Sequence, residues 1–534
     1  MAKKKENKHL SIPMAVHKYP NLKELRSQVS QHWKIDNIQP FFPPIEKMFK
    51  TDIINNSWEY GIKFSKPMLS TADGTFVKTS EGDMEVHKKI SMILSSFRLM
   101  QGDYGGPMGL PRTQEHSELI TQKVQSHNNA AYVGAIISAS LNQSGCQHFP
   151  EIHGIFSGMS KNHEIDISDD YEELIERSWF SSAVGNTFNI RLRDGISPSG
   201  FVHTRKRKHQ VLLGDETELD DVVDLDFENL TLNEPDIKQI AHGDDDSDDD
   251  ESDSSSVSTS YIFAVRSCDC SEIDSDDGEE EESEPFAWAS FTNVPVQITV
   301  MEKFEGTIYS LFKLYPDSAK WMDWISQVIF ALAYAQKNFS FVHNDLHANN
   351  IMFKKTGKEY FYYSMEGVLY RVPTHGYIIK LIDFERSIAS IRIQGMRETK
   401  TFISDQFDID EEAGGQYNME PFLTKGQPEI RPNMSFDLVR LATSLFWDLY
   451  PDGPDQECSD RLFILMKEWM TTTDGKSVLF SEVSKHDRFH GFHLYKAIVR
   501  FCSGGIPKKE IPKLKDLYFI EKVPAGESVC AIDF

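Results

Sequence analysis

Residues 341–353 have the types and the spacing of a loop that transfers phosphoryl groups. They read Phe-Val-His-Asn-Asp-Leu-His-Ala-Asn-Asn-Ile-Met-Phe. In this loop Asp345 can accept the proton of an attacking hydroxyl group, and Asn350 can hold a magnesium ion on a row of phosphates. Asp383, at the end of the apolar run 377–383, offers the second acidic ligand that such an ion needs. The sequence therefore predicts Asp345 as the catalytic residue and Asn350 and Asp383 as metal ligands.

Buried elements on either side of the loop must hold these side chains in place. Apolar residues at helical spacing predict a buried helix over 321–336, directly before the loop. The Ile-rich run 377–383 predicts a buried strand, and 435–449 predicts a helix that begins at Ser435. His343 is expected to pack under the loop and hold its backbone.

The order of these motifs resembles that of the protein-kinase-like superfamily. The pattern His-x-Asp-Leu-x-x-x-Asn at 343–350, followed by Asp-Phe-x at 383–385, resembles the catalytic and metal-binding motifs of that superfamily. The segment Ser-Phe-Asp-Leu-Val-Arg-Leu from 435 resembles the start of the kinase helix whose acid pins the catalytic loop. The resemblance assigns that structural role to Asp437.

The resemblance also implies a nucleotide site and the cofactors ATP and Mg²⁺. Residues 300–306, Val-Met-Glu-Lys-Phe-Glu-Gly, look like the gatekeeper and hinge of a kinase. Met301 would then be the gatekeeper, the backbone from Glu302 to Phe304 would bind adenine, and Met352 would form the floor of the adenine pocket. His347 stands where protein kinases usually carry a lysine near the γ-phosphate.

The amino-terminal part offers a weaker match. A hairpin over 60–79 with Gly74 in its turn is a candidate phosphate loop, although it lacks the full Gly-x-Gly-x-x-Gly pattern. The strand 84–89 would supply the phosphate-binding lysine. Since side chains alternate along a strand, and Val86 suits an adenine-facing position better than His87, Lys88 is preferred. Lys89 and Lys63 remain alternatives.

Several departures from the kinase pattern bear on regulation. The helix expected over 128–142 contains no glutamate to pair with the lysine, and the nearest upstream acids, Glu115 and Glu118, leave that ion pair unassigned. Asn344 replaces the usual arginine, so activation through a phosphorylated loop is not expected. Glu385 replaces the glycine after Asp-Phe, which predicts a less switchable loop.

Two kinase groups share these departures. His-Asn-Asp and Asp-Phe-Glu look like small-molecule kinases of the choline and aminoglycoside type. The longer pattern 343–352 resembles the virion-associated Ser/Thr protein kinases of large cytoplasmic DNA viruses, including the poxvirus ones. An extra Tyr-rich hairpin over 359–376 favours the viral group. The function expected from the resemblance is phosphorylation of Ser/Thr hydroxyls of proteins; the alternatives are a small-molecule kinase and a pseudokinase scaffold.

The chain has 534 residues and a formal net charge of −26, but this charge is concentrated in one stretch. Residues 215–284 hold 28 acidic and two basic side chains, so the rest of the chain is formally neutral. Such runs of like charge predict a disordered acidic insert, which is either a solvated linker or a docking and regulatory arm. Basic proteins are candidate partners of this arm. Nucleic acid is not indicated, although a basic cluster at 205–208 lies just upstream.

The expected fold class is α+β: a two-lobed protein-kinase-like fold with a long disordered acidic insert in the small lobe. Six Cys at no regular spacing, without a signal peptide or membrane segment, favour an intracellular, reducing compartment, the cytoplasm, or the virion if the viral resemblance holds. The expected divisions are an N-terminal extension (1–55), the first part of the small lobe (56–158), an insertion (159–295), the last small-lobe strand and hinge (296–304) and the large lobe (305–534).

Overall fold

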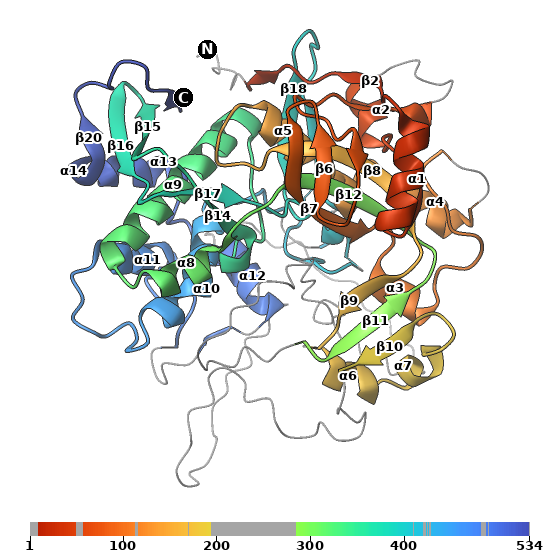
Figure 1. The fold of residues 1–534 in the computed structure, drawn as a ribbon. Helices are drawn as coiled ribbons and strands as arrows, with labels where there is room; N and C mark the ends of the chain where they lie inside the picture. Colours follow the sequence, from red (N-terminus) through yellow and green to blue (C-terminus); the bar gives the residue numbers. More distant parts are fainter. Residues whose placement is uncertain are drawn as a thin grey trace, which may run out of the picture. The chain divides into compact units, whose positions relative to one another are not determined.

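The computed structural model describes residues 9–49, 57–112, 116–168, 170–193, 285–409, 411–419, 423, 425–426, 429–481, 487–489 and 491–532. The fold is a mixed α and β structure, as the sequence predicts (Figure 1). The acidic stretch 215–284, the basic cluster 205–208 and Glu115 lie outside the described residues. No helix in the described ranges is long and apolar enough to cross a membrane.

A six-stranded antiparallel sheet forms the amino-terminal part. Its strand order is β3-β8-β12-β7-β6-β5. The strands are β3 (Ile35–Gln39), β5 (Ser70–Thr71), β6 (Phe76–Thr79), β7 (Gly82–Met92), β8 (Ile152–Ser160) and β12 (Val294–Glu302). Every residue of β12 is buried, which fits its β-branched composition.

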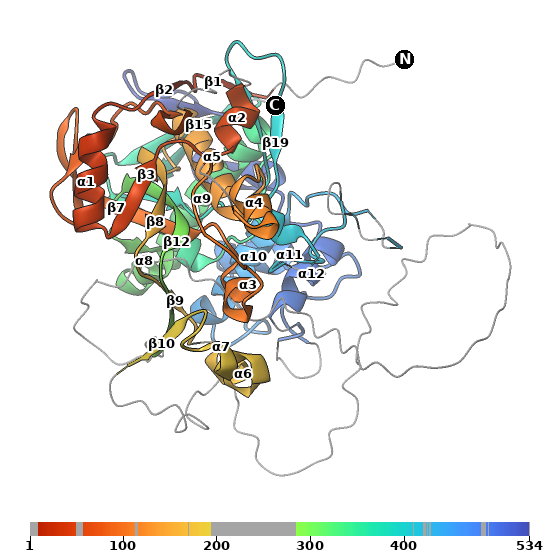
Figure 2. The ribbon, with the colours of Figure 1, turned by 90° about the vertical axis from the view of Figure 1, so that its right-hand side faces the viewer.

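Two helices cover this sheet from opposite sides. Helix α1 (Leu22–His32) contacts β3 and β5, whereas α5 (Ala130–Gln143) contacts β8 and β12 (Figure 2). The side chain of Asn129 caps α5 by accepting a hydrogen bond from the Ala131 amide at 3.2 Å. Helix α5 therefore packs on two central strands, whereas α1 packs on the two edge strands of the sheet.

The carboxy-terminal part is mainly helical. Its central helix α9 (Ser318–Phe339) contains the predicted helix 321–336 and buries the apolar face that the periodicity predicts. The predicted helix 435–449 is α10 (Phe436–Leu449), and the predicted strand 377–383 is β17 (Tyr377–Leu381). Strand β17 pairs with β14 (Ile351–Lys355), which pairs with β13 (Gly306–Thr307). Helices α8 (Ile308–Leu314), α11 (Arg461–Trp469) and α12 (Phe492–Phe501) complete this part.

The Tyr-rich segment forms the predicted extra hairpin, β15 (Tyr360–Met365) and β16 (Val368–Pro373). Two short strands from the end of the chain, β20 (Phe519–Ile520) and β21 (Val529–Ala531), flank it. The ring of Tyr363 stacks on Phe330 of α9 with a centroid distance of 4.0 Å. The hairpin is thereby fixed to the helical part.

A separate three-stranded sheet lies between β8 and β12 in the sequence. It has the order β10-β11-β9 and comprises β9 (His163–Asp166), β10 (Asn189–Leu192) and β11 (Ala287–Phe291). Leu192 pairs with Ala287, and the Arg193 amide donates to the Phe286 carbonyl at 2.9 Å. The chain therefore leaves the described structure and returns to it at neighbouring points, which fits an insertion.

Shorter elements surround these parts. The strands are β1 (Ser11–Ile12), β2 (Val16–Lys18), β4 (Tyr60–Ile62), β18 (Ala389–Ile393) and β19 (Lys400–Phe402). The helices are α2 (Pro44–Phe49), α3 (Ser96–Gln101), α4 (Glu118–Val124), α6 (Tyr171–Glu176), α7 (Ser178–Ala183), α13 (Pro507–Glu510) and α14 (Lys515–Tyr518).

Candidate active site

A buried carboxylate holds the loop that carries Asp345. Asp437, in the first turn of α10, accepts hydrogen bonds from the backbone amides of His343 and Asn344, each at 3.0 Å. The side chain of His343 in turn bonds the Ile382 carbonyl through Nε2 at 2.8 Å. Burial raises the pKa of Asp437 to about 6, against the lowering effect of His343 and of the two amides. The structure thus joins α10, the loop and the end of β17.

One predicted acid, Asp383, and the neighbour of another, Asn344, have unusual backbone conformations. Asn344 and Asp383 both have a φ of 65° in the left-handed region, which non-glycine residues rarely adopt. The side chain of Asn344 is fixed at both ends, since its oxygen accepts from the Tyr417 hydroxyl at 2.6 Å and its nitrogen donates to the Arg386 carbonyl at 3.0 Å. Backbone strain of this kind persists only where surrounding contacts enforce it, and it is concentrated at functional sites.

Asp345 is surrounded by hydrogen-bond donors and positive charge. The Tyr495 hydroxyl of α12 donates to its Oδ1 at 2.6 Å, and Arg386 Nη1 lies 3.8 Å from its Oδ2. Burial alone would raise the pKa of Asp345, but Arg386, His347, the Tyr495 hydroxyl and Arg440 outweigh burial and hold that pKa well below its usual range. Asp345 is therefore ionised near neutral pH.

Asn350 lies at the end of the same loop, in the short 3₁₀ helix Ala348–Asn350. Its amide nitrogen donates to the Asp345 carbonyl at 2.8 Å and lies 3.1 Å from His347 Nε2. These contacts occupy the nitrogen and leave the amide oxygen as the group available to a metal ion. Burial lowers the pKa of His347 to about 4, although Asp345 opposes this shift, so the imidazole is neutral near pH 7. His347 cannot supply the positive charge of the lysine that it replaces.

Lys89 of β7 reaches the predicted metal ligand. Its ammonium lies 2.5 Å from Asp383 Oδ1 and 2.8 Å from Glu385 Oε1. All three side chains are largely shielded from solvent. Burial alone would lower the pKa of Lys89, but the two carboxylates outweigh burial and raise it. Asp383 and Glu385 thus form one charged cluster with a lysine from the sheet.

Lys88 has the opposite orientation. Its ammonium lies 5.0 Å from the centre of the Trp33 ring, at the end of α1. It is also near Gly74, because a Cβ built on Gly74 would lie 3.9 Å from it. Gly74 lies in the turn between β5 and β6, where the Asp73 carboxylate accepts from the amides of Thr75 and Phe76 at 2.8 and 2.7 Å. The hairpin predicted over 60–79 is therefore shorter, because its first strand, β4, pairs with β2. The structure brings Gly74 and Lys88 together, but it brings Lys89 to Asp383.

The predicted hinge residues lie at the junction of the two parts. The Glu302 carboxylate contacts Lys380 at 2.7 Å and Lys354 at 2.8 Å, and it accepts from the Glu151 amide at 2.9 Å. Its side chain is fully engaged, so only its backbone can contact a nucleotide. Met301 lines the same narrow cavity as Lys89 and Asp383. Met352, on β14, and Phe304 are both buried, and Lys63 is exposed at the end of β4.

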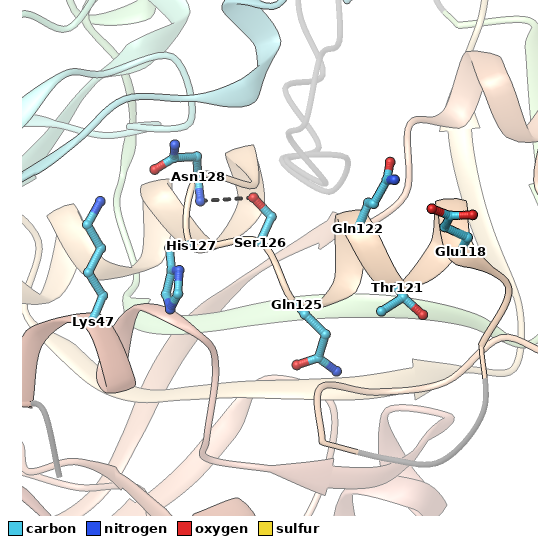
Figure 3. A pocket seen from close by; sticks show the side chains of 8 residues that line it. All are labelled: Lys47, Glu118, Thr121, Gln122, Gln125, Ser126, His127 and Asn128. Carbon is cyan, nitrogen blue, oxygen red and sulfur yellow. Dashed lines mark hydrogen bonds between the residues drawn. The ribbon is translucent and has the colours of Figure 1, made fainter. Parts of the chain in front are cut away.

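The cavity at Lys89 and Asp383 has a volume of about 10 Å³, which is room for about one water molecule. A much larger cavity of about 620 Å³ lies at α2, α4 and the segment between α4 and α5, and Figure 3 shows its polar lining. It contains none of the predicted site residues. It is lined by Lys47, Glu118, Thr121, Gln122, Gln125, Ser126, His127 and Asn128. Size alone therefore does not identify the chemical site.

The segment after Glu385 is fixed by ion pairs that the sequence did not reveal. Lys123 of α4 contacts Asp405 at 2.8 Å and Glu411 at 2.7 Å. Asp405 also accepts from the Ala130 amide at the start of α5 at 2.9 Å. Arg386 lies 3.4 Å from Glu412. Arg386 directly follows Asp-Phe-Glu, and its positive charge was the signal in the sequence for an ion pair in this segment.

Comparisons with known proteins give partial similarity to protein kinases. No family model matches the sequence. A stretch of 219 residues is 23% identical to the probable serine/threonine-protein kinase 380R of Invertebrate iridescent virus 6, covering 39% of this chain and 37% of the relative. Stretches of 63 residues are 35% and 33% identical to the serine/threonine-protein kinase haspin of Mus musculus and Bos taurus. They cover 12% of this chain and 8% of each haspin.

The chain thus spans well under half the length of these curated relatives. All three are named serine/threonine-protein kinases, and one of them is viral. The site described above and these partial similarities point to the same broad class of protein, the protein-kinase-like superfamily.

Proposed function

We propose that this protein is a serine/threonine protein kinase that transfers the γ-phosphoryl group of ATP to protein hydroxyls with the help of Mg²⁺. The observation that carries the proposal is the cluster of Asp345, Asn350 and Asp383 around one loop, with Lys89 reaching Asp383 from the sheet. In this proposal residues 56–158 and 296–304 form a small lobe, 305–534 form a large lobe, and 159–295 are an insertion.

The residues of the site fit a magnesium-bound nucleotide. Carboxylate and amide oxygens are ligands that Mg²⁺ prefers, and Asp383 and Asn350 provide one of each. When bound, the ion would neutralise charge on the phosphates. Asp345 would orient the acceptor hydroxyl and take its proton at Oδ2 or Oδ1. Because its pKa is held low, Asp345 is a weak base, and its main contribution is orientation.

We assign the phosphate contact to Lys89 in place of Lys88. Neighbouring side chains of a strand point to opposite faces, so only one of the two lysines can face Asp383. Lys89 contacts Asp383, whereas Lys88 lies over Trp33. Val86 shares its face of β7 with Lys88 and is buried there, so its apolar side chain does not distinguish the nucleotide face from the Trp33 face. Met301 and the backbone of 302–304 would contact adenine.

Proteins are the proposed substrates because the similar proteins are named serine/threonine-protein kinases. A small-molecule kinase of the choline or aminoglycoside type is the second candidate, favoured by the Asp-Phe-Glu motif at 383–385. The proposed location is an intracellular, reducing compartment, the cytoplasm, or the virion if the viral resemblance holds; the similarity to a protein of an iridescent virus supports the viral alternative. Immunoblots of purified particles test that placement. Basic proteins remain the proposed partners of the acidic stretch.

The test is a phosphate-transfer assay with labelled ATP, Mg²⁺ and four acceptors: a basic protein, an acidic protein, choline and an aminoglycoside. We expect label on Ser or Thr of a protein. Asp345→Asn and Asp383→Asn should abolish transfer while the protein still folds. Lys89→Met should lower kcat/KM for ATP by about 100-fold or more, and Lys88→Met by less than about threefold.

Transfer to the small molecules alone would replace the first candidate by the second. Equal rates in the wild-type protein and both Asn variants would show that the label comes from another enzyme and that this protein is a pseudokinase. If Lys88→Met were the damaging variant, the assignment of the two faces of β7 would be wrong.

A further inference from the structure

Helix α5 lacks an acidic residue where it approaches Lys89. Its sequence, Ala-Ala-Tyr-Val-Gly-Ala-Ile-Ile-Ser-Ala-Ser-Leu-Asn-Gln, contains no carboxylate. Gly134 of this helix lines the narrow cavity together with Lys89 and Glu385. A Cβ built on Gly134 would lie 2.7 Å from Glu385 Cγ and 3.3 Å from the Glu385 backbone nitrogen. The space beside the helix is therefore filled by the side chain and backbone of Glu385.

The Glu385 carboxylate faces β7. It contacts the Lys89 ammonium at 2.8 Å and accepts a hydrogen bond from the Ser91 hydroxyl. Lys89 and Ser91 are two residues apart on β7, so their side chains point to the same face. The side chain of Glu385 is only 14% exposed, so its ion pair with Lys89 is weakly screened by water.

Asp383 also contacts Lys89, but it has a second task in the proposed function. If Asp383 binds a metal ion on the phosphates, its negative charge interacts with both that ion and Lys89. Glu385 keeps its contacts to Lys89 and Ser91 and remains a counter-ion. The cluster then contains one carboxylate for the metal and one for the lysine.

We propose that Glu385 is the residue that positions Lys89 for the nucleotide phosphates, and that it takes this role in place of an acid on α5. The inference rests on the proposed function. Gly134 is required because any larger residue would displace Glu385. Since Asp383 and Glu385 are only two residues apart, the same short segment positions the lysine and carries the metal ligand, and the ion pair does not depend on an acid carried by the helix.

The first test compares Glu385→Gln, which keeps the shape and removes the charge, with wild type. We expect a KM for ATP at least tenfold higher, with an unchanged magnesium concentration for half-maximal rate. The matched control is Glu398→Gln on the same segment, which removes an exposed acid next to Lys400. It should leave both quantities within about twofold.

The second test moves the acid to the helix. Gly134→Glu alone should lose activity, because the new side chain collides with Glu385. Glu385→Gly alone should also lose activity. The double variant Gly134→Glu with Glu385→Gly should be at least tenfold more active than Glu385→Gly alone, since a carboxylate again lies beside Lys89.

A third measurement needs no activity. The Lys89 side chain is only 12% exposed and two carboxylates hold its ammonium group, so its amine should react slowly with acetic anhydride when peptide mapping follows the labelling. Glu385→Gln should speed labelling of Lys89 at least threefold without changing that of Lys88.

An unchanged KM in Glu385→Gln, or unchanged labelling of Lys89, overturns the inference. A rise in the magnesium requirement at constant KM also overturns it, since Glu385 would then be a metal ligand. A wild-type protein that transfers no phosphate refutes the proposed function instead, and the pairing of Glu385 with Lys89 is then decided by the labelling alone.

Discussion

Removal of the Asp437 carboxylate tests how the catalytic loop is held. In Asp437→Ala the amides of His343 and Asn344 lose their buried acceptor. An unsatisfied buried donor costs about 1–3 kcal/mol, so the two together cost about 2–6 kcal/mol. At pH 7, however, Asp437 of the wild-type protein is a buried charge, which reduces the difference in the free energy of unfolding between the wild-type protein and Asp437→Ala.

The size of that reduction follows from the pKa. The pKa of Asp437 is about 6 in the folded protein and 3.8 in its ordinary state, a difference worth about 3 kcal/mol. Because the folded state binds the proton more tightly, the contribution of this group to stability falls as pH rises from about 4 to 6. We therefore expect Asp437→Ala to be more strongly destabilised at pH 4.5 than at pH 7, by about 2 kcal/mol, because the rest of the roughly 3 kcal/mol develops only below pH 4.5.

The assay is urea unfolding of both proteins at pH 4.5 and pH 7, together with kcat at pH 7. Since Asn344 holds a strained conformation next to Asp345, release of its amide should misplace Asp345 and lower kcat by about 100-fold. Equal stability of the two proteins at both pH values, with kcat within twofold, would refute the idea that Asp437 holds the loop. Thr443→Val, on the same helix, is the control.

Three further predictions concern other parts of the molecule. His148 is buried between the Ile379 carbonyl and the Tyr363 hydroxyl, and burial lowers its pKa to about 4. Its contribution of about 3 kcal/mol to the free energy of unfolding should therefore be lost as pH falls from 6.5 to 4. In urea titrations the stability advantage of the wild-type protein over His148→Asn should shrink over this range, and parallel curves of stability against pH would contradict this. Tyr495→Phe should lower kcat by about tenfold at unchanged KM for ATP in initial-rate assays. The reason is that a hydrogen bond to the ionised Asp345 is worth about 1.5–3 kcal/mol. A changed KM with constant kcat would contradict this positioning role of Tyr495. Deletion of 215–284 should leave the melting temperature within about 2 °C, because the residues that flank the stretch, on β10 and β11, pair with each other. The deletion should weaken binding of basic proteins in low salt. A collapse of the fold would show that this stretch is structurally required.

The loop and its flanking elements could be predicted because their signals are local. Asp345 and Asn350 lie in one short segment, and the helix and strand beside it follow from the spacing of apolar residues. Asp383 could be placed because a buried strand ends at it. These relations involve neighbours along the chain, so the amino-acid sequence contains them directly.

The choice between Lys88 and Lys89 could not be predicted in the same way. A strand places them on opposite faces, but the sequence does not state which face meets Asp383. That depends on the packing of Trp33 on one side and of α5 on the other. Likewise, Tyr495 and Arg386, which contact Asp345, come from other segments of the chain, and only tertiary packing brings them to it.

The unassigned ion pair shows the same division. The sequence by itself determined that the helix over 128–142 carries no acid and that Glu385 stands where a glycine is usual. Only the tertiary structure decided that these two departures belong together, because Gly134 and Glu385 are far apart in the chain, yet a Cβ built on Gly134 would lie within 3.4 Å of Glu385. Residue types are fixed by the sequence, whereas the pairing of a charge with its counter-ion depends on distance, and distance is set by the fold.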